Sequence, residues 1–199
     1  MGIADRFLYL RDGRIAAEYT PEDLLLLPEA DILGMGLRSP HEGKSLPAPS
    51  VLDESPAVLK TAGLSKRIRK EVIFDDIFPA FPKGKVTAIT GQNGAGKTTL
   101  AQILCGLARQ TRGHILIDGE KARAAVRRRE IYHCAIFSGR RILILDEPTS
   151  GLDGQNMRLI AERLKSEARN GRTILVITHD RELIESCCDN IVEVEKRSP

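Results

Sequence analysis

Continuous apolar runs recur through the second half of the chain and are bounded by glycine, proline or charged residues. The strongest runs are "KVTAIT" (85–90), "RILILD" (141–146) and "TILVITHD" (173–180). Runs without polar alternation are typical of strands that are buried on both faces, as in a parallel sheet. Weaker strand patterns occur at 71–81, 114–119, 131–137 and 190–195.

Helical patterns separate these strands. A helix is predicted to begin near Gly96 and to continue through 98–109. A second helix is predicted to end at Gly171, and Asp180 is placed to cap a third. Apolar residues recur at helical spacing in the second one, at Met157, Ile160, Leu164 and Ala168. This alternation of strands and helices predicts an α/β fold with a mostly parallel sheet.

The first 58 residues have a different pattern. The runs "RFLYL" and "IAAEY" flank Asp12-Gly13, which favours a β-hairpin, and Thr20 followed by Pro21 is typical of a helix start. Residues 31–58 contain four prolines with scattered glycine and serine, which indicates a linker. The predicted organisation is therefore an N-terminal unit at 1–30, a linker at 31–58 and a domain at 59–199.

Composition narrows the classes of function. The 30 basic and 27 acidic residues give a net charge of +3, which is too small to indicate nucleic acid as a partner. The apolar runs are too short for a membrane span, and the N-terminus lacks the pattern of a signal peptide. The four cysteines lack zinc-ligand spacing and are interpreted as reduced thiols. The basic stretch 121–130 is interpreted as a solvated surface.

The stretch "GQNGAGKTT" follows a buried strand and precedes a helix, and it fits the pattern GxxxxGK[ST]. Glycines allow several backbone N–H groups to converge on phosphate oxygens at a helix N-terminus. Lys97 is placed to reach the phosphates and the Thr98 hydroxyl to bind Mg²⁺. The alternative is an ordinary glycine-rich turn. The candidate nucleotide-binding residues are Gly91, Gln92, Asn93, Gly94, Ala95, Gly96, Lys97, Thr98 and Thr99.

Three further candidates follow buried strands. Asp146 ends "ILILD", where a carboxylate can hold a Mg²⁺ shell, and Glu147 beside it can polarise a water molecule. His179 follows "LVIT", and the two strands are expected to be neighbours, so that the imidazole can approach a terminal phosphate. The alternatives are a solvated acidic loop and a structural histidine.

In this order, these motifs resemble the ATP-binding subunits of ABC transporters over roughly residues 60–199. "GQNGAGKTT" resembles Walker A, "ILILDEP" Walker B, "SGLD" the D-loop and "VITHD" the switch-histidine region. The resemblance implies a P-loop NTPase fold with an additional antiparallel β subdomain. It also implies ATP and Mg²⁺ as cofactors, Glu147 as catalytic base, His179 as sensor of the γ-phosphate, and Thr98 and Asp146 as metal-site residues. The implied partners are a second ATP-binding domain and a transmembrane component, at the inner face of the cell membrane on the cytoplasmic side.

One stretch indicates a branch of this transporter family. "GRRILILDEPTSGLDGQNM" is most similar to ATPases of the energy-coupling-factor type, which import vitamins, cobalt or nickel. Residues 4–10 ("ADRFLYL") also align with residues 188–194 ("CDNIVEV"). The N-terminal unit therefore resembles the tail of an upstream ATPase copy, which implies a parent with two fused ATPase domains. Chance similarity between short strands is the alternative.

The chain departs from this family between the two Walker motifs. No Gln loop and no "LSGGQ" signature is present, and only 49 positions separate Lys97 from Asp146. The helical signature subdomain is therefore expected to be missing, through an internal deletion near 137–138. Ile68 stands where the family often has an aromatic residue that stacks on adenine. Three hypotheses follow: an importer ATPase, a nucleotide-binding remnant without hydrolysis, and a soluble ABC protein that is not linked to transport.

Overall fold

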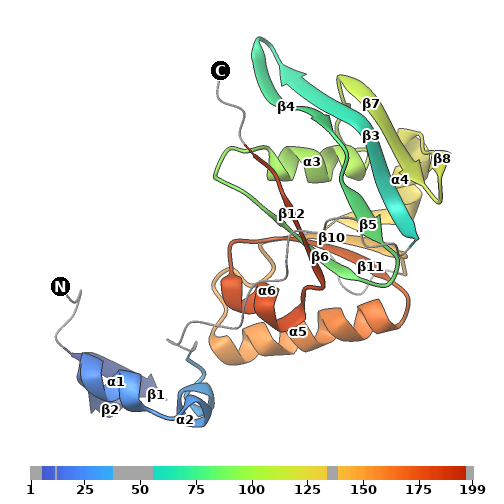
Figure 1. Cartoon of the computed structure of the whole chain (residues 1–199). Helices are drawn as coiled ribbons and strands as arrows, with labels where there is room; N and C mark the ends of the chain where they lie inside the picture. The colour runs from blue at the N-terminus through green and yellow to red at the C-terminus, as the bar shows by residue number, and fades with distance from the viewer. Residues whose placement is uncertain (1–5, 12, 38–55, 134–138, 196–199) are drawn as a thin grey trace.

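A five-stranded parallel sheet forms the centre of the fold, in the order β12-β6-β11-β10-β9 (Figure 1). The computed structural model describes residues 6–11, 13–37, 56–133 and 139–195. The side chains of β10 and β11 are almost entirely inaccessible to solvent, as expected for central parallel strands. The strands are β6 (Val86–Thr90), β9 (Ile131–His133), β10 (Ile142–Asp146), β11 (Thr173–Ile177) and β12 (Asn190–Glu193).

An antiparallel sheet in the order β4-β3-β7-β8 lies above the parallel one in Figure 1, and β5 pairs with β3. Helix α3 (Lys97–Leu104) lies between the two sheets, and its apolar side chains belong to the same core as residues of both. The strands are β3 (Ala57–Ile68), β4 (Glu71–Ile77), β5 (Ala80–Pro82), β7 (Arg112–Ile117) and β8 (Glu120–Lys121). The predicted P-loop NTPase fold with an antiparallel subdomain is confirmed.

Helices α5 (Gly154–Arg169) and α6 (Arg181–Cys187) cover the other face of the parallel sheet (Figure 1). The predicted stripe on α5 is buried at three of its four positions. Ile160 is only half-buried, and Ala161 is buried in the adjacent position. Gly171 follows the end of α5 with a φ of 88°, and the Asp180 carboxylate accepts a hydrogen bond from Leu183 N at the start of α6. None of the described helices is long and apolar enough to cross a membrane.

Two local expectations differ from the structure, and a third is tested only in part. Helix α3 ends at Leu104 rather than near 109, because Gly106 adopts a left-handed φ of 77°. The stretch 121–130 is not simply a solvated surface, since it forms helix α4 (Ala124–Glu130) and Arg127 is only 4% exposed. The Arg127 guanidinium donates to the Ala122 carbonyl, and desolvation lowers its pKa. The strand predicted over 131–137 is seen at 131–133, and the remainder lies outside the described residues.

The N-terminal unit contains the predicted hairpin of β1 (Phe7–Arg11) and β2 (Arg14–Tyr19), followed by α1 (Pro21–Leu26). Thr20 caps α1 in a reciprocal arrangement with Asp23, which lowers the pKa of that carboxyl group mainly through the hydrogen bond from the Thr20 hydroxyl. A further helix, α2 (Glu29–Gly34), was not predicted and reaches into the predicted linker. Residues 38–55 of that linker lie outside the described residues.

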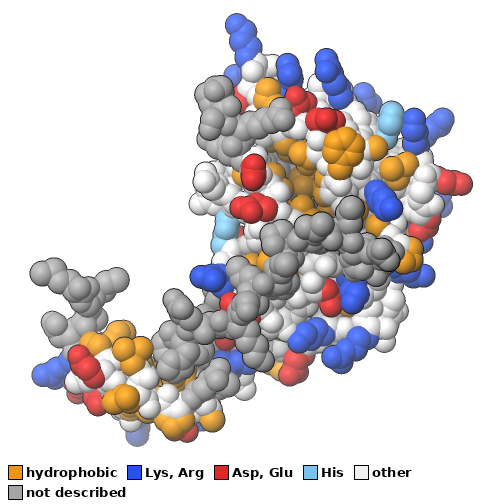
Figure 2. All heavy atoms as spheres, in the orientation of Figure 1, with side chains coloured by type: hydrophobic (Ala, Val, Ile, Leu, Met, Phe, Trp, Pro, Cys, Tyr) orange, Lys and Arg blue, Asp and Glu red, His pale blue; other side chains and the backbone are white. Residues whose placement is uncertain are grey.

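Two contacts join the residues that follow α2 to the N-terminus of α5. Gly154 N donates to the Gly36 carbonyl at 2.8 Å, and the Arg158 guanidinium donates to the Leu37 carbonyl at 3.2 Å. A Cβ atom at Gly154 would lie 2.5 Å from the Leu37 oxygen, so the close approach requires glycine. The hairpin itself projects away from the domain and carries exposed hydrophobic side chains (Figure 2).

Replacement of Glu167 by alanine is expected to destabilise the domain by about 1–2 kcal/mol. Glu167 on α5 is only 4% exposed, and its carboxylate forms ion pairs with Arg163 at 2.6 Å and with Arg172 at 2.9 Å. Because both arginines are partly exposed, solvent reduces the loss below that of a fully buried pair. Urea unfolding checks the value, with Glu162→Ala on the exposed face of the same helix as the control. Equal midpoints for the two variants would contradict the expectation.

Candidate functional site

The loop between β6 and α3 requires glycine at two positions for different reasons. Gly91 has a φ of 137°, and a Cβ atom there would lie 2.2 Å from the Val194 carbonyl oxygen. Gly96 has a φ of 98°, and its Cβ atom would lie 2.5 Å from the Ile73 side chain. The loop therefore packs tightly against β4 and against Val194, which follows β12, and it curls at the N-terminus of α3. The first N–H groups of a helix have no acceptor within the helix and can meet an anion.

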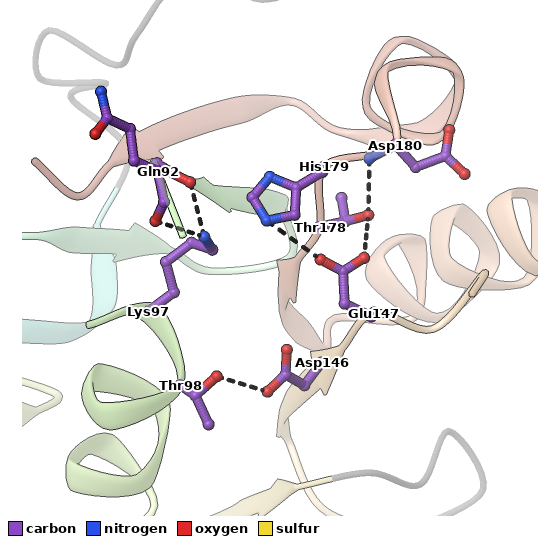
Figure 3. Close-up of polar contacts among 9 residues, drawn as sticks. Gln92, Lys97, Thr98, Asp146, Glu147, Thr178, His179 and Asp180 are labelled. Carbon is purple, nitrogen blue, oxygen red and sulfur yellow. Dashed lines mark hydrogen bonds and ion pairs between the residues drawn. The ribbon is translucent and has the colours of Figure 1, made fainter. Parts of the chain in front are cut away.

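Lys97 is the first residue of α3, and its side chain turns back over the loop (Figure 3). The ammonium donates to the carbonyls of Gly91 at 2.7 Å and Gln92 at 3.1 Å. The residue is only 8% exposed, and no carboxylate pairs with it in the described part of the chain. A buried cation that contacts only neutral carbonyls is an electrostatically incomplete arrangement. An anion beside the loop would complete it.

Thr98 and Asp146 come together from different elements. The Thr98 hydroxyl, in the first turn of α3, donates to the Asp146 carboxylate at the end of β10 at 3.1 Å (Figure 3). A hydroxyl and a carboxylate in contact are the hard oxygen ligands that Mg²⁺ prefers, together with water and phosphate oxygens. The pair fits a magnesium ion, which would polarise phosphate oxygens when bound.

Glu147 is held at the neighbouring strand ends. Its backbone has a left-handed φ of 46°, an unusual conformation for a residue with a side chain. The Thr178 hydroxyl donates to the carboxylate at 3.2 Å, and the His179 Nε2 atom lies 3.7 Å from its other oxygen (Figure 3). The expected neighbourhood of the two strands is confirmed, because β10 pairs with β11 in parallel with Asp146 opposite Ile177.

The loop and the histidine face one pocket. A cavity of about 500 Å³ is lined by Thr90, Gly91, Gln92, Asn93, His179 and Glu193. The other loop residues differ in accessibility: Gly94 is exposed, Thr99 is half-buried, and Ala95 is buried in the core beneath the loop. The Ala95 side chain has no polar atom, and its backbone N–H donates to the Gln92 carbonyl at 3.1 Å, so Ala95 supports the shape of the loop.

Sequence reasoning missed the residues that hold Glu147 in place. Thr178 bonds both to Glu147 and to the backbone N–H of Asp180. Thr149 donates to the Asp180 carboxylate at 2.9 Å and is only 2% exposed. The sequence does show a threonine immediately before His179, at Thr178, and another after "DEP", at Thr149. Whether these hydroxyl groups reach Glu147 or Asp180 depends on the register of β10 against β11, which the sequence alone does not give.

The comparisons with known proteins agree with this geometry. A model of the ABC transporter family matches residues 74–135, and a model described as an AAA domain, putative AbiEii toxin, type IV TA system, matches residues 124–185. A putative ABC transporter ATP-binding protein of Treponema denticola is 28% identical over 261 positions, covering 96% of this chain and 53% of that protein. The Nod factor export ATP-binding protein I of Sinorhizobium fredii is 25% identical, covering 71% of this chain and 61% of that protein.

A similar solved structure is cbiO1 of Clostridium perfringens, described as part of the ABC transporter complex cbiONQ. It has a TM-score of 0.64 and 21% identity, and the match covers 71% of this chain and 86% of that chain. The fold and the loop define a P-loop nucleotide-binding domain. The fold is that of the ATP-binding domains of ABC transporters, and the chain is similar to ABC transporter ATP-binding proteins. It spans about half the length of the Treponema relatives that it matches.

Proposed function

We propose that the chain is an ATP-binding component of an ABC-type transporter, in which ATP binding and hydrolysis drive the movement of a substrate across a membrane. The observation that carries the proposal is the buried Lys97 ammonium, which contacts only loop carbonyls at the N-terminus of α3. A triphosphate beside the loop would supply the missing negative charge and accept hydrogen bonds from backbone N–H groups at the N-terminus of α3. The neighbouring Thr98–Asp146 pair supports Mg·ATP rather than a simple anion.

The residue roles are part of the same proposal. Residues 91–99 cradle the phosphates, and Thr98 and Asp146 hold the metal. Glu147 orients a water molecule for attack and accepts its proton, and His179 contacts the γ-phosphate. Thr178 fixes the orientation of the Glu147 carboxylate, as its 3.2 Å hydrogen bond suggests. The exposed Ile68 side chain supplies apolar contact to a base but no aromatic stacking.

We propose further that the transporter is an energy-coupling-factor-like importer and that residues 1–30 are the tail of an upstream ATPase copy. The "GRRILILDEPTSGLDGQNM" stretch and the likeness to cbiO1 support the importer branch. The Treponema alignment supports the fused parent, because it includes the N-terminal unit and yet takes up only 53% of that relative. The similarity to a Nod factor export protein supports an exporter instead, so transport direction is the property to test.

A second candidate function is a nucleotide-binding remnant that does not hydrolyse ATP, and the short link between β9 and β10 favours it. These strands are parallel neighbours, with Ile131 opposite Ile142, yet only residues 134–141 join them. A parallel crossover ordinarily takes about a dozen or more residues and usually contains a helix. The 261-position alignment with a chain of 199 residues also supports an internal deletion. The deletion point proposed near 137–138 lies outside the described residues.

The proposed partners are a second ATP-binding domain and a transmembrane component, which would place the chain at the cytoplasmic face of the cell membrane. The named complex of cbiO1 with its partners supports such an assembly for that relative. Co-purification of the tagged chain with membrane proteins from its source cells tests the partnership, and uptake or export of a labelled substrate by the reconstituted complex tests the direction.

The Mg²⁺ part of the site gives a separate prediction. Asp146→Asn is expected to remove most of the gain in ATP affinity that Mg²⁺ provides, because the amide that replaces the carboxylate carries no charge for the metal shell. Affinity for ATP in the presence of EDTA should change little. Calorimetric titrations with and without Mg²⁺ measure both quantities, with Asp153→Asn outside the site as the control. An unchanged Mg²⁺ gain in Asp146→Asn would remove Asp146 from the proposed metal site.

A further inference from the structure

Two segments of the chain carry opposite charges, although the net charge of the whole chain is only +3. Residues 121–129 contain five basic residues and no acidic residue, whereas residues 15–37 contain five acidic residues and no basic residue. The basic segment includes most of helix α4, and the acidic segment includes helices α1 and α2. Each segment therefore presents the charge that would complement the other.

The outer face of α4 is basic and partly apolar. Arg128 and Arg129 are exposed, and neither forms an ion pair with another residue in the described ranges. The single acidic residue of the helix, Glu130, is already paired with Arg141 at 2.7 Å. Val126 is 45% exposed and precedes Arg129 by three positions, so the two side chains lie on the same side of the helix.

The turn after α3 adds a second apolar side chain to this face. The Arg128 guanidinium donates to the Gly106 carbonyl at 3.2 Å, which holds the turn against α4. Leu107, the next residue in the turn, is 63% exposed. We call Leu107, Val126, Arg128 and Arg129 the α4 surface. It suits a partner that carries apolar side chains and a carboxylate together.

Helix α1 has these properties. Glu22, Leu25 and Leu26 are spaced by three and four positions, which places them on one side of the helix, and we call them the α1 surface. The leucines are 56% and 82% exposed, and Glu22 is exposed without an ion pair among the described residues. A helix of six residues is not stable by itself, so α1 gains from packing on another surface.

Helix α1 lies far from α4 of its own chain. The contacts of Gly36 with Gly154 and of Leu37 with Arg158 hold the residues that follow α2 at the start of α5. Figure 1 shows α1 and α4 on opposite sides of the molecule. The two surfaces nevertheless occur once each in every copy, so two copies can exchange them reciprocally, as in a symmetric dimer.

We propose that the chain forms a homodimer in which the α1 surface of each copy packs on the α4 surface of the other. The two leucines of α1 cover the apolar side chains of the α4 surface, and the Glu22 carboxylate meets the Arg129 guanidinium. Burial of the apolar side chains supplies the affinity, and the pairing of opposite charges fixes the orientation. This association does not depend on bound nucleotide, and it is separate from the proposed function.

Sedimentation equilibrium of the full chain, without nucleotide or Mg²⁺, tests the proposal. The expected species has twice the mass of the 21.9 kDa chain. Leu25→Lys should weaken dimerisation about tenfold or more, because both interfaces lose an apolar contact and gain a cation beside the arginines. Leu159→Lys is the matched control, since Leu159 is 58% exposed against 56% for Leu25 and lies on α5, outside both surfaces. A monomeric parent chain, or equal weakening by both variants, would overturn the proposal.

Charge exchange tests the orientation without removing apolar surface. Glu22→Arg and Arg129→Glu should each weaken the dimer, because each variant places like charges together at both interfaces. The double variant restores opposite charges and should dimerise more tightly than either single variant. A double variant that is weakened by the sum of the two single changes would overturn the pairing of Glu22 with Arg129.

Discussion

Lys97→Ala is expected to weaken the binding of Mg·ATP at least about tenfold, which corresponds to ~1.4 kcal/mol or more. In the parent chain the ammonium lies 2.7 Å from the Gly91 carbonyl and is almost completely buried. When a triphosphate binds, this cation exchanges weak contacts with neutral carbonyls for charge-assisted contacts with phosphate oxygens. Alanine removes that exchange but keeps the helix, because alanine is the best helix former.

Isothermal titration calorimetry measures the difference directly. Lys83→Ala is the matched control. Lys83 is exposed and precedes the N-terminal end of β6, whereas the glycine loop follows the C-terminal end. The control should bind Mg·ATP as the parent chain does. Equal affinity in Lys97→Ala and the parent would show that the loop does not bind phosphate through this residue, and the proposed function would lose the observation that carries it.

The elements that the sequence predicts well are those whose pattern is local. The strand β6, the glycine loop and the start of α3 follow each other without interruption, so one stretch of sequence contains the strand, the turn and the helix cap. The same holds for α5, where three apolar positions and Gly171 determine the buried face and the end of the helix. The parallel pairing of β10 and β11 was also expected, because their apolar runs are continuous.

The features that the sequence does not predict depend on contacts between distant segments. Helix α4 packs close to the turn after α3: a Cβ atom at Gly106 would lie 2.7 Å from the Ala124 carbonyl, and Arg128 donates to the Gly106 carbonyl. Arg127 is buried by this packing and not by its own sequence context. The environment of Arg141 also depends on residues distant in the sequence. Its pKa is raised chiefly by the hydrogen bond with Asp118 and also by the one with Glu130.

The candidate site follows the same division. The loop residues and the strand-end carboxylates are recognisable as motifs, and their convergence in the structure agrees with the expected geometry. The Thr178–Glu147 hydrogen bond was not foreseen, because it requires the register of two strands that are separated by α5. The catalytic and metal roles themselves stay predictions that mutagenesis has to test.

The purified chain alone is expected to show no ATP turnover above the level of the Lys97→Ala variant. Hydrolysis builds negative charge on the γ-phosphoryl group, and preorganised donors have to meet that charge in the transition state. The family resemblance implies that such donors come from the signature segment of an opposing domain, and the sequence contains no "LSGGQ". Loss of one such donor commonly costs about 10²–10³ in rate, and here the whole segment is missing.

The structure adds a second reason for slow turnover. Glu147 and His179, the proposed base and sensor, have side chains that are 39% and 50% exposed, so solvent screens the charges on which the chemistry depends. Glu147→Gln should therefore leave the measured rate unchanged, because there is no turnover for it to abolish. A coupled-enzyme assay of phosphate release compares the parent chain with Lys97→Ala and Glu147→Gln at equal concentration. A steady rate in the parent that Glu147→Gln removes would show that donors from elsewhere complete the site, and the importer ATPase would then be favoured over the non-hydrolysing remnant.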